Sequence, residues 1–207
     1  HKVLVAPMPY EEPDDLYFVW RDYGPIFDLK RGWLAGTDVA DLQKGGPVIE
    51  AAVGLQRGQV TLAVREGAEP MEIPVMLTSP GLFELLGVAP ARGRVFAPDE
   101  VGPGRRPLIV LTHELWTRLG ADEGIIGKDL RLNGTAHAVI GVMPSTFSFV
   151  RHSSLGPPQG AEAFITFSTH LAETNPNGGS YAGLVRARAG TPPETVAAAV
   201  DVIGRTI

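Results

Sequence analysis

The 207-residue sequence predicts an α+β fold. Segments with strand character outnumber those with helix character, and they do not alternate with helices as a doubly wound parallel sheet would require. The best-marked hairpin spans residues 129–142, where Asn133-Gly134 supplies the two positive-φ residues of a type I′ turn. These observations favour a mixed fold with a large share of antiparallel sheet.

The first half of the chain predicts mainly strands. Thr37 is a suitable N-cap for a short helix that ends at Gly45-Gly46, with Asp38 in its first turn. Turns are expected at Arg57-Gly58 and Glu66-Gly67, because glycine favours chain reversal. Expected strands lie at 3–6, 16–20, 48–56, 60–64 and 71–77, and residues 23–36 are expected to form a loop.

The second half contains better-marked helix ends. Ser79-Pro80 combines a hydroxyl cap with a proline at the first helical position, and Gly87 follows that helix. Thr112 is the expected cap of a helix whose Leu115, Trp116 and Leu119 share one face, and Gly120 closes it. Strands are expected at 108–111, 161–167 and 182–188, and a final helix begins near 191–194.

Composition narrows the possible functions. The net charge of −5 and the pI of about 5.5 argue against a nucleic-acid partner, which would require clustered Lys and Arg, and the only basic run is Arg105-Arg106. The absence of cysteine excludes disulfides and thiolate metal sites. No apolar run approaches the roughly 18 residues of a membrane span, and no signal peptide is recognisable, so the chain reads as an excised soluble piece.

Motifs for chemistry are incomplete. His113-Glu114 begins a metalloprotease motif, but Thr117 stands where the second histidine is needed. The five histidines show no ligand spacing, and neither a phosphate-binding loop nor a nucleophile elbow is present. Asn133-Gly134-Thr135 matches a glycosylation acceptor, although the hairpin turn explains the same residues. We therefore expect no catalytic, cofactor-binding or metal-binding residues.

Two regions are candidates for contact with a partner. Trp33 and Phe27 belong to an apolar loop that must be packed down or used as a contact surface. Asn175 and Asn177 lie in the 173–180 loop, which like the 151–160 loop is rich in Pro, Gly, Ser and Asn. These four side chains are the predicted partner contacts.

Three segments carry a family resemblance. They are SPGLFELLGVAPARGRVFAP at 79–98, VLTHELWTRLGADEGIIG at 110–127 and LRLNGTAHAVIGVMP at 130–144. They resemble the MacB-like periplasmic core domain of MacB/FtsX-type permeases of ABC transporters. Weaker similarity follows in order at 7–20 and 185–202, so the resemblance covers nearly the whole chain.

The resemblance implies a two-lobed extracytoplasmic domain without enzymatic activity. Its membrane-proximal, porter-like α+β lobe would comprise residues 1–76 and 144–207, and a smaller α/β outer lobe would be inserted at 77–143. The whole permease would lie in the bacterial inner membrane, with this domain in the periplasm. Its partners would be a cytoplasmic ATPase, a second permease subunit and a periplasmic adaptor or substrate, to which the domain would transmit ATP-driven movement.

Two other functions stay open at this point. A free-standing periplasmic ligand-binding or chaperone-like module would show a deep apolar pocket. A hydrolase would bring a histidine and a carboxylate together beside a serine or threonine from distant parts of the chain.

Overall fold

The computed structural model describes residues 13–23, 29–63, 69–100, 102, 104–149, 160–167, 170–175 and 178–204. The chain divides into two compact units, and each is described by itself. Unit 1 comprises residues 1–56 and 169–207, and unit 2 comprises residues 57–168. The middle unit is thus longer at both ends than the insertion predicted at 77–143.

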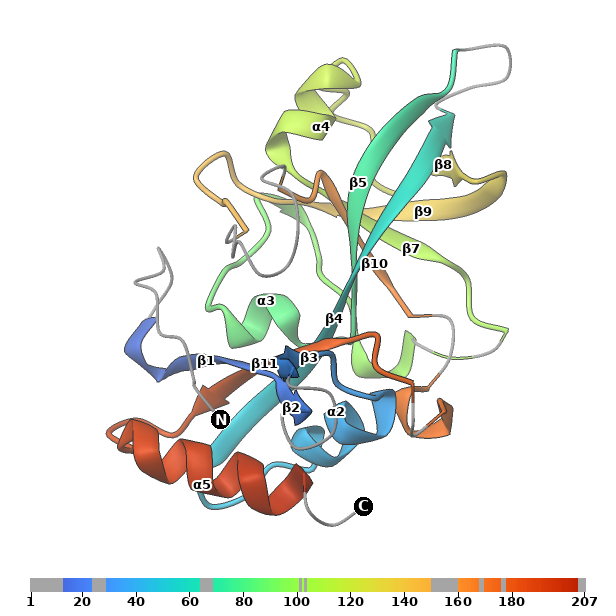
Figure 1. Cartoon of the computed structure of the whole chain (residues 1–207). Coiled ribbons are helices and arrows are strands. Elements are labelled where there is room, and N and C mark those ends of the chain that lie inside the picture. Colours follow the sequence, from blue (N-terminus) through green and yellow to red (C-terminus); the bar gives the residue numbers. More distant parts are fainter. Residues whose placement is uncertain are drawn as a thin grey trace. The chain divides into compact units, whose positions relative to one another are not determined.

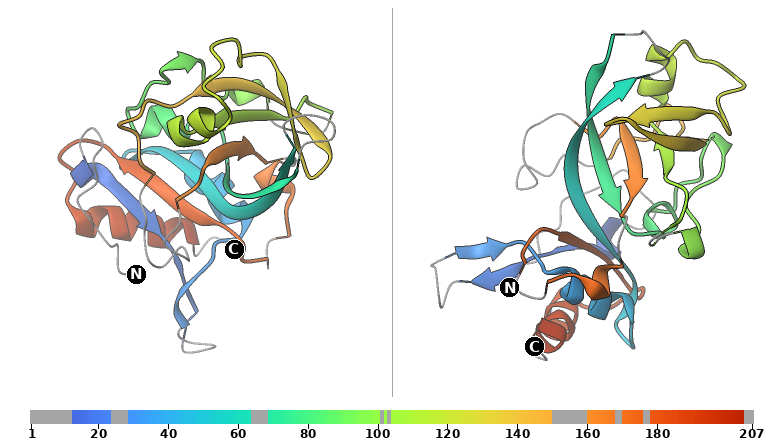
Figure 2. Two further views of the ribbon diagram at one scale, coloured as in Figure 1. Left: turned by 90° about the horizontal axis from the view of Figure 1, so that it is seen from above. Right: turned by 90° about the vertical axis from the view of Figure 1, so that its right-hand side faces the viewer.

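Unit 1 contains an antiparallel sheet in the order β1 (Leu16–Val19), β11 (Ala182–Ala187), β4 (Ile49–Ala63). Helices α2 (Gly36–Gln43) and α5 (Pro193–Gly204) lie on one face of it (Figure 2). Short 3-10 turns, η1 (Pro13–Asp15) and η4 (Leu171–Glu173), flank these elements. Gly54 lets this face approach closely, because a Cβ there would lie 2.9 Å from Val39 Cγ1 of α2.

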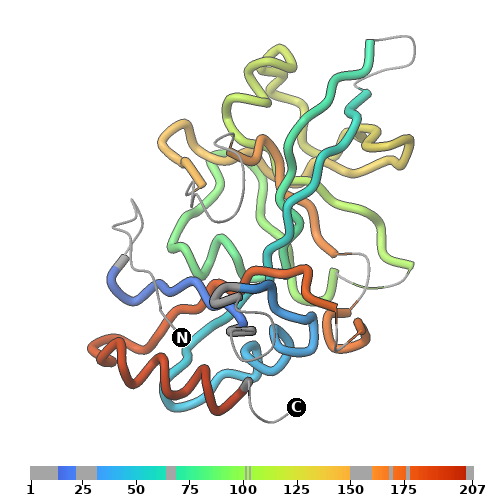
Figure 3. The backbone as a smooth tube through the Cα atoms, viewed as in Figure 1, coloured from blue at the N-terminus to red at the C-terminus, as the bar shows by residue number. Residues whose placement is uncertain are grey.

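Unit 2 contains a closed ring of strands. From β4, whose second half belongs to this unit, the order runs through β5 (Met71–Thr78), β10 (Ala163–Thr166), β7 (Leu108–Leu111) and β9 (Thr135–Val142). β8 (Asp129–Leu132) pairs with both β9 and β4 and closes the ring into a small barrel. Figure 3 shows β4 and β5 running alongside each other.

The barrel interior is filled by alternate residues of its strands, as a closed barrel requires. They include Leu62, Ile73, Ile109, Leu130 and Val139, which are almost completely buried. Helix α4 (His113–Arg118) adds Leu115 to this core, with Trp116 and Leu119 packed against it at partial exposure. The helix face predicted from the sequence is therefore confirmed, with Leu115 as its fully buried member.

The outer face of β10 is covered by aromatic side chains. Phe83 of α3 (Leu82–Leu85) meets Phe164 edge to face at a ring-centroid distance of 5.1 Å. Phe147 and Phe149 pack on the same Phe164 ring. The short β6 (Arg92–Gly93) extends the sheet from β9, and the 3-10 turn η2 (Pro98–Glu100) follows it.

Several sequence predictions are confirmed. The mixed α+β class is correct, and Thr112 Oγ1 accepts a hydrogen bond from Leu115 N as the cap of α4. The hairpin of β8 and β9 turns at Asn133 (φ 48°) and Gly134 (φ 81°), as the Asn-Gly pair predicts.

The predicted turn at Arg57-Gly58 is wrong, because β4 continues through it from Ile49 to Ala63. Gly58 has a packing role: a Cβ there would lie 2.9 Å from Leu77 Cδ1 and 3.2 Å from Val75 Cγ2. Part of the predicted loop at 23–36 is also wrong, because β2 (Arg21–Tyr23) pairs with β3 (Leu29–Gly32). The predicted strand at 3–6 and turn at 66–67 lie outside the described residues.

Two predicted helix caps are wrong as well. Helix α2 begins at Gly36, and the Asp38 carboxylate accepts a 2.8 Å hydrogen bond from the N–H of its N-cap residue, Ala35. Helix α3 begins after Gly81, whose φ of 94° places it in the left-handed region, and no side chain caps it. The local polar residue was read correctly as a helix-start signal, but the helix begins one or two residues away.

Candidate functional site

Trp33 is a surface aromatic residue of unit 1. It follows β3 and is 38% exposed. Its ring meets the buried Trp20 edge to face at a centroid distance of 5.7 Å, and Trp20 stacks on Phe18 at 6.3 Å. Trp33 is therefore the exposed end of an aromatic row that begins in the core of unit 1, which gives it a firm base and an accessible ring.

The two predicted contact segments meet beside Trp33. Leu34 N donates to Tyr181 O at 2.7 Å, and the carbonyl of Leu34 accepts from Ser180 N and Tyr181 N. The exposed Asn175 precedes this segment and accepts a hydrogen bond from Gly178 N on its backbone carbonyl. Phe27 and Asn177 lie outside the described residues. We use the name Trp33 surface for Trp33 together with Asn175.

A buried charge supports the Trp33 surface from below. Asp38 is 5% exposed, and besides capping Ala35 N it lies 3.5 Å from Arg21 Nη1. The pair joins β2 to the start of α2, so it fixes the backbone that follows Trp33. Removing either partner would leave a buried charge uncompensated.

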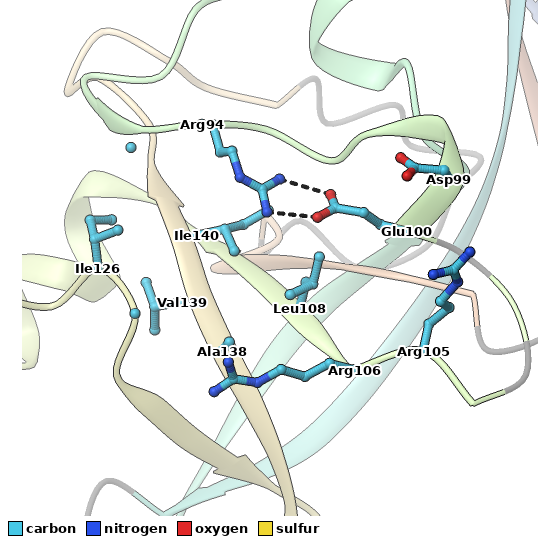
Figure 4. A pocket seen from close by; sticks show the side chains of 12 residues that line it. Arg94, Asp99, Glu100, Arg105, Arg106, Leu108, Ile126, Ala138, Val139 and Ile140 are labelled. Atoms are coloured by element: carbon cyan, nitrogen blue, oxygen red, sulfur yellow. Dashed lines mark hydrogen bonds and ion pairs between the residues drawn. The ribbon is translucent and has the colours of Figure 1, made fainter.

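Unit 2 carries a pocket of about 700 Å³ that the sequence did not reveal (Figure 4). Its floor is the outer face of β7 and β9, with Leu108, Ala138 and Ile140, and Ile126 borders it. Arg94, Asp99, Glu100, Arg105 and Arg106 form its rim. We call it the Arg94 pocket.

Two glycines bring Arg94 over this floor. A Cβ at Gly93 would lie 2.1 Å from Ile140 O, and one at Gly141 would lie 2.3 Å from Arg94 O. Arg94 N donates to Ile140 O at 2.8 Å across this close approach. Glycine is therefore required at both positions, and the Gly-Arg dipeptide at 93–94 was the available sequence signal.

The rim is organised by two ion pairs. The Arg94 guanidinium donates to both Glu100 oxygens, at 2.8 and 2.6 Å, and Ala97 N donates to the same carboxylate at 2.8 Å. Hydrogen bonding from Arg94 holds the pKa of Glu100 below its ordinary value and raises that of Arg94. Arg106 Nη2 donates to Asp129 at 2.7 Å.

A second hollow of about 580 Å³ shares Glu100, Arg105 and Arg106 with the Arg94 pocket. Strand ends of the barrel line it, and His137 lies on its wall. A ring nitrogen of His137 donates to Thr135 O at 3.0 Å, and burial lowers the pKa of the imidazole. His137 is therefore neutral at pH 7 and adds no charge to the hollow.

Neither site shows a catalytic constellation within the described ranges. Those residues include no group of three or more His, Asp or Glu placed to hold a metal ion. The incomplete motif at His113 is structural: the His113 ring packs on Trp116, and Thr117 Oγ1 donates to His113 O. In the same part of the chain, no helix has the length and hydropathy of a membrane span.

Comparison with solved structures supports the fold. The periplasmic region of MacB from Actinobacillus actinomycetemcomitans aligns with a TM-score of 0.64 and 17% identity, covering 92% of this chain and 82% of that one. A domain of a putative permease from Porphyromonas gingivalis aligns with a TM-score of 0.62 and 19% identity, over 86% and 73% of the two chains. The extracellular domain of the noncanonical ABC-type transporter YknZ from Gram-positive bacteria gives 0.57 and 14%, over 84% and 83%.

No curated protein matches the sequence significantly. The family described as MacB-like periplasmic core domain, in contrast, matches residues 5–203, which is nearly the whole chain. The match includes both units and all three segments that carried the resemblance. The chain therefore belongs to the family of MacB-like periplasmic core domains, the periplasmic domains of MacB/FtsX-type ABC transporter permeases.

Proposed function

We propose that this domain transmits movement, driven by a cytoplasmic ATPase, to a partner or substrate in the periplasm. Family membership over residues 5–203 carries this proposal, because permeases of this type work with cytoplasmic ATPases. In the permease, unit 1 would be the membrane-proximal lobe and unit 2 the outer one. A second permease subunit and a periplasmic adaptor complete the proposed assembly in the inner membrane.

We assign partner contact to the Trp33 surface. Aromatic residues that are exposed at one end and anchored at the other are typical of binding hot spots, because they lose little side-chain entropy on binding. Trp33 has this arrangement through its contact with Trp20. The hydrogen bonds between Leu34 and residues 180–181 hold the Asn175 segment beside it.

The test is Trp33→Ala in the permease that contains this domain. We expect transport or partner binding to fall at least about tenfold, as for a hot-spot residue, while the isolated domain keeps most of its thermal stability. Val202→Ala is the matched control, because Val202 is an exposed apolar residue on α5 of the same unit. Unchanged transport by Trp33→Ala, or unfolding of the domain, would refute the assignment.

A further inference from the structure

The Arg94 pocket combines an apolar floor with a ring of cationic side chains. From this combination we infer that unit 2 binds a small amphiphilic carboxylate, that is, one carboxylate group on an apolar body. The inference concerns a ligand of the domain itself and does not depend on how movement is transmitted.

The size and floor of the pocket suit a small molecule. A volume of about 700 Å³ lies within the range typical of small-molecule sites, roughly 300–1,000 Å³. Leu108 and Ile140 present apolar surface from β7 and β9, and Ile126 is 39% exposed beside them. Ile126, Trp33 and Val202 are the only large apolar side chains that the described residues expose to this degree.

The floor is rigid before any ligand arrives. The segment after Ile126 is bound along β9, because Gly127 N donates to Val139 O and Val139 N donates to Lys128 O. On the other side, the close approach of Gly93 to Ile140 fixes β6. A preorganised floor reduces the ordering that binding would otherwise require.

The charges around the floor favour an anion. Three arginines face two carboxylates in the lining, although the chain as a whole carries a net charge of −5. Arg94 is occupied by Glu100, and Arg106 by Asp129. The exposed Arg105 guanidinium has neither an ion pair nor a hydrogen bond to any described residue. It is the cation that is available to a ligand.

A carboxylate matches this cation in shape as well as in charge. The planar fork of a guanidinium donates two parallel hydrogen bonds to a carboxylate, and such charge-assisted bonds are stronger than neutral ones. With the carboxylate on Arg105, an attached hydrocarbon chain can lie on Leu108, Ile140 and Ile126. Glu100 does not oppose this binding strongly, because Arg94 and Ala97 N already compensate its charge.

The first test uses decanoate as the probe, below its micelle-forming concentration, on the 207-residue chain. Isothermal titration calorimetry should give saturable binding, and the amide signals of Gly93 and Gly127 should shift in NMR spectra of ¹⁵N-labelled protein. Acetate should bind much more weakly because it lacks the chain, and decyltrimethylammonium should not bind at these residues. Equal binding of the two decyl amphiphiles, or shifts confined to other residues, would overturn the inference.

The second test uses variants. Arg105→Gln should weaken decanoate binding about tenfold, the loss expected for one charge-assisted pair. Ile126→Asp should weaken it at least as much, because it removes apolar contact and adds a like charge to the rim. Arg118→Gln is the matched control, since Arg118 pairs with Glu162 outside the pocket.

We expect the control to bind decanoate like the parent chain. Unchanged affinity in both Arg105→Gln and Ile126→Asp would overturn the site. Tighter binding of decyl phosphate than of decanoate would overturn the choice of a carboxylate. Binding of a periplasmic partner protein that depends on Arg105, in a chain that does not bind decanoate, would assign the pocket to a protein contact instead.

Discussion

The two units bury their apolar residues in different ways. Unit 2 closes six described strands into a barrel whose interior is filled from every side and from α4. Unit 1 holds an open sheet with α2 and α5 on one face. A closed barrel pairs its strands with one another and fixes its own shape, whereas an open sheet depends on its helices. The Trp33 surface lies on the open-sheet unit, and the Arg94 pocket lies on the outer wall of the barrel.

The largest expected effect tests the barrel core. Leu115→Ala should lower the free energy of unfolding of unit 2 by about 2–5 kcal/mol, because it leaves a cavity beneath α4. Chemical denaturation gives the size of the loss, and hydrogen exchange localises it to unit 2. Leu119→Ala, at a partly buried site on the same helix end, should cost clearly less. Equal effects of the two variants would show that α4 does not plug the barrel as described.

The matching test for unit 1 addresses how closely α2 approaches η4. A Cβ at Gly36 would lie 2.0 Å from Thr174 Oγ1 and 2.7 Å from Leu171 O, and the latter is a backbone atom that cannot rotate away. Gly36→Ala should therefore cost about 1–3 kcal/mol, the usual range for overpacking. Gly160→Ala has open space and serves as the control. If hydrogen exchange rises in both units equally, the two do not unfold separately and the comparison fails.

Local signals in the sequence were sufficient where local chemistry decides the structure. The Asn133-Gly134 turn, the Thr112 cap and the α4 face depend on neighbouring residues only, and all three were predicted correctly. Gly58 was read as a turn residue because glycine has two uses, reversal and close packing. Contact with Leu77 and Val75, distant in sequence, selects the second use.

The same reasoning explains what was missed at the sites. Trp33 could be proposed from the sequence because an exposed tryptophan in an apolar segment is unusual. The Arg94 pocket assembles residues from positions 93 to 140, and only the β6–β9 and β7–β9 pairings bring them together. Arg105-Arg106 was too short a basic run to attract attention in the sequence. Its importance comes from the partners that Arg94 and Arg106 have and Arg105 lacks.

A smaller effect is expected at the Thr112 cap in unit 2. Thr112→Ala removes the acceptor of Leu115 N and should cost about 1 kcal/mol. Thr117→Ala on the same helix is the control, because its hydroxyl binds the His113 carbonyl within the helix and caps nothing. Thermal denaturation of both variants is sufficient. A loss in Thr112→Ala no larger than in Thr117→Ala would show that the barrel core holds α4 without its cap.

The smallest effect concerns the rim of the Arg94 pocket. Because the folded-state pKa of Glu100 is below its ordinary value, its charge stabilises unit 2 at pH values above the unfolded pKa, near 4.3. That stability is lost as the pH falls through the lower folded-state value. Glu100→Gln should therefore be less stable than the parent chain at pH 7, by under about 1 kcal/mol for a partly exposed pair, and equal to it near pH 2. A difference that persists at pH 2, measured by urea denaturation, would mean that the side chain acts by packing and that its ion pair with Arg94 contributes nothing.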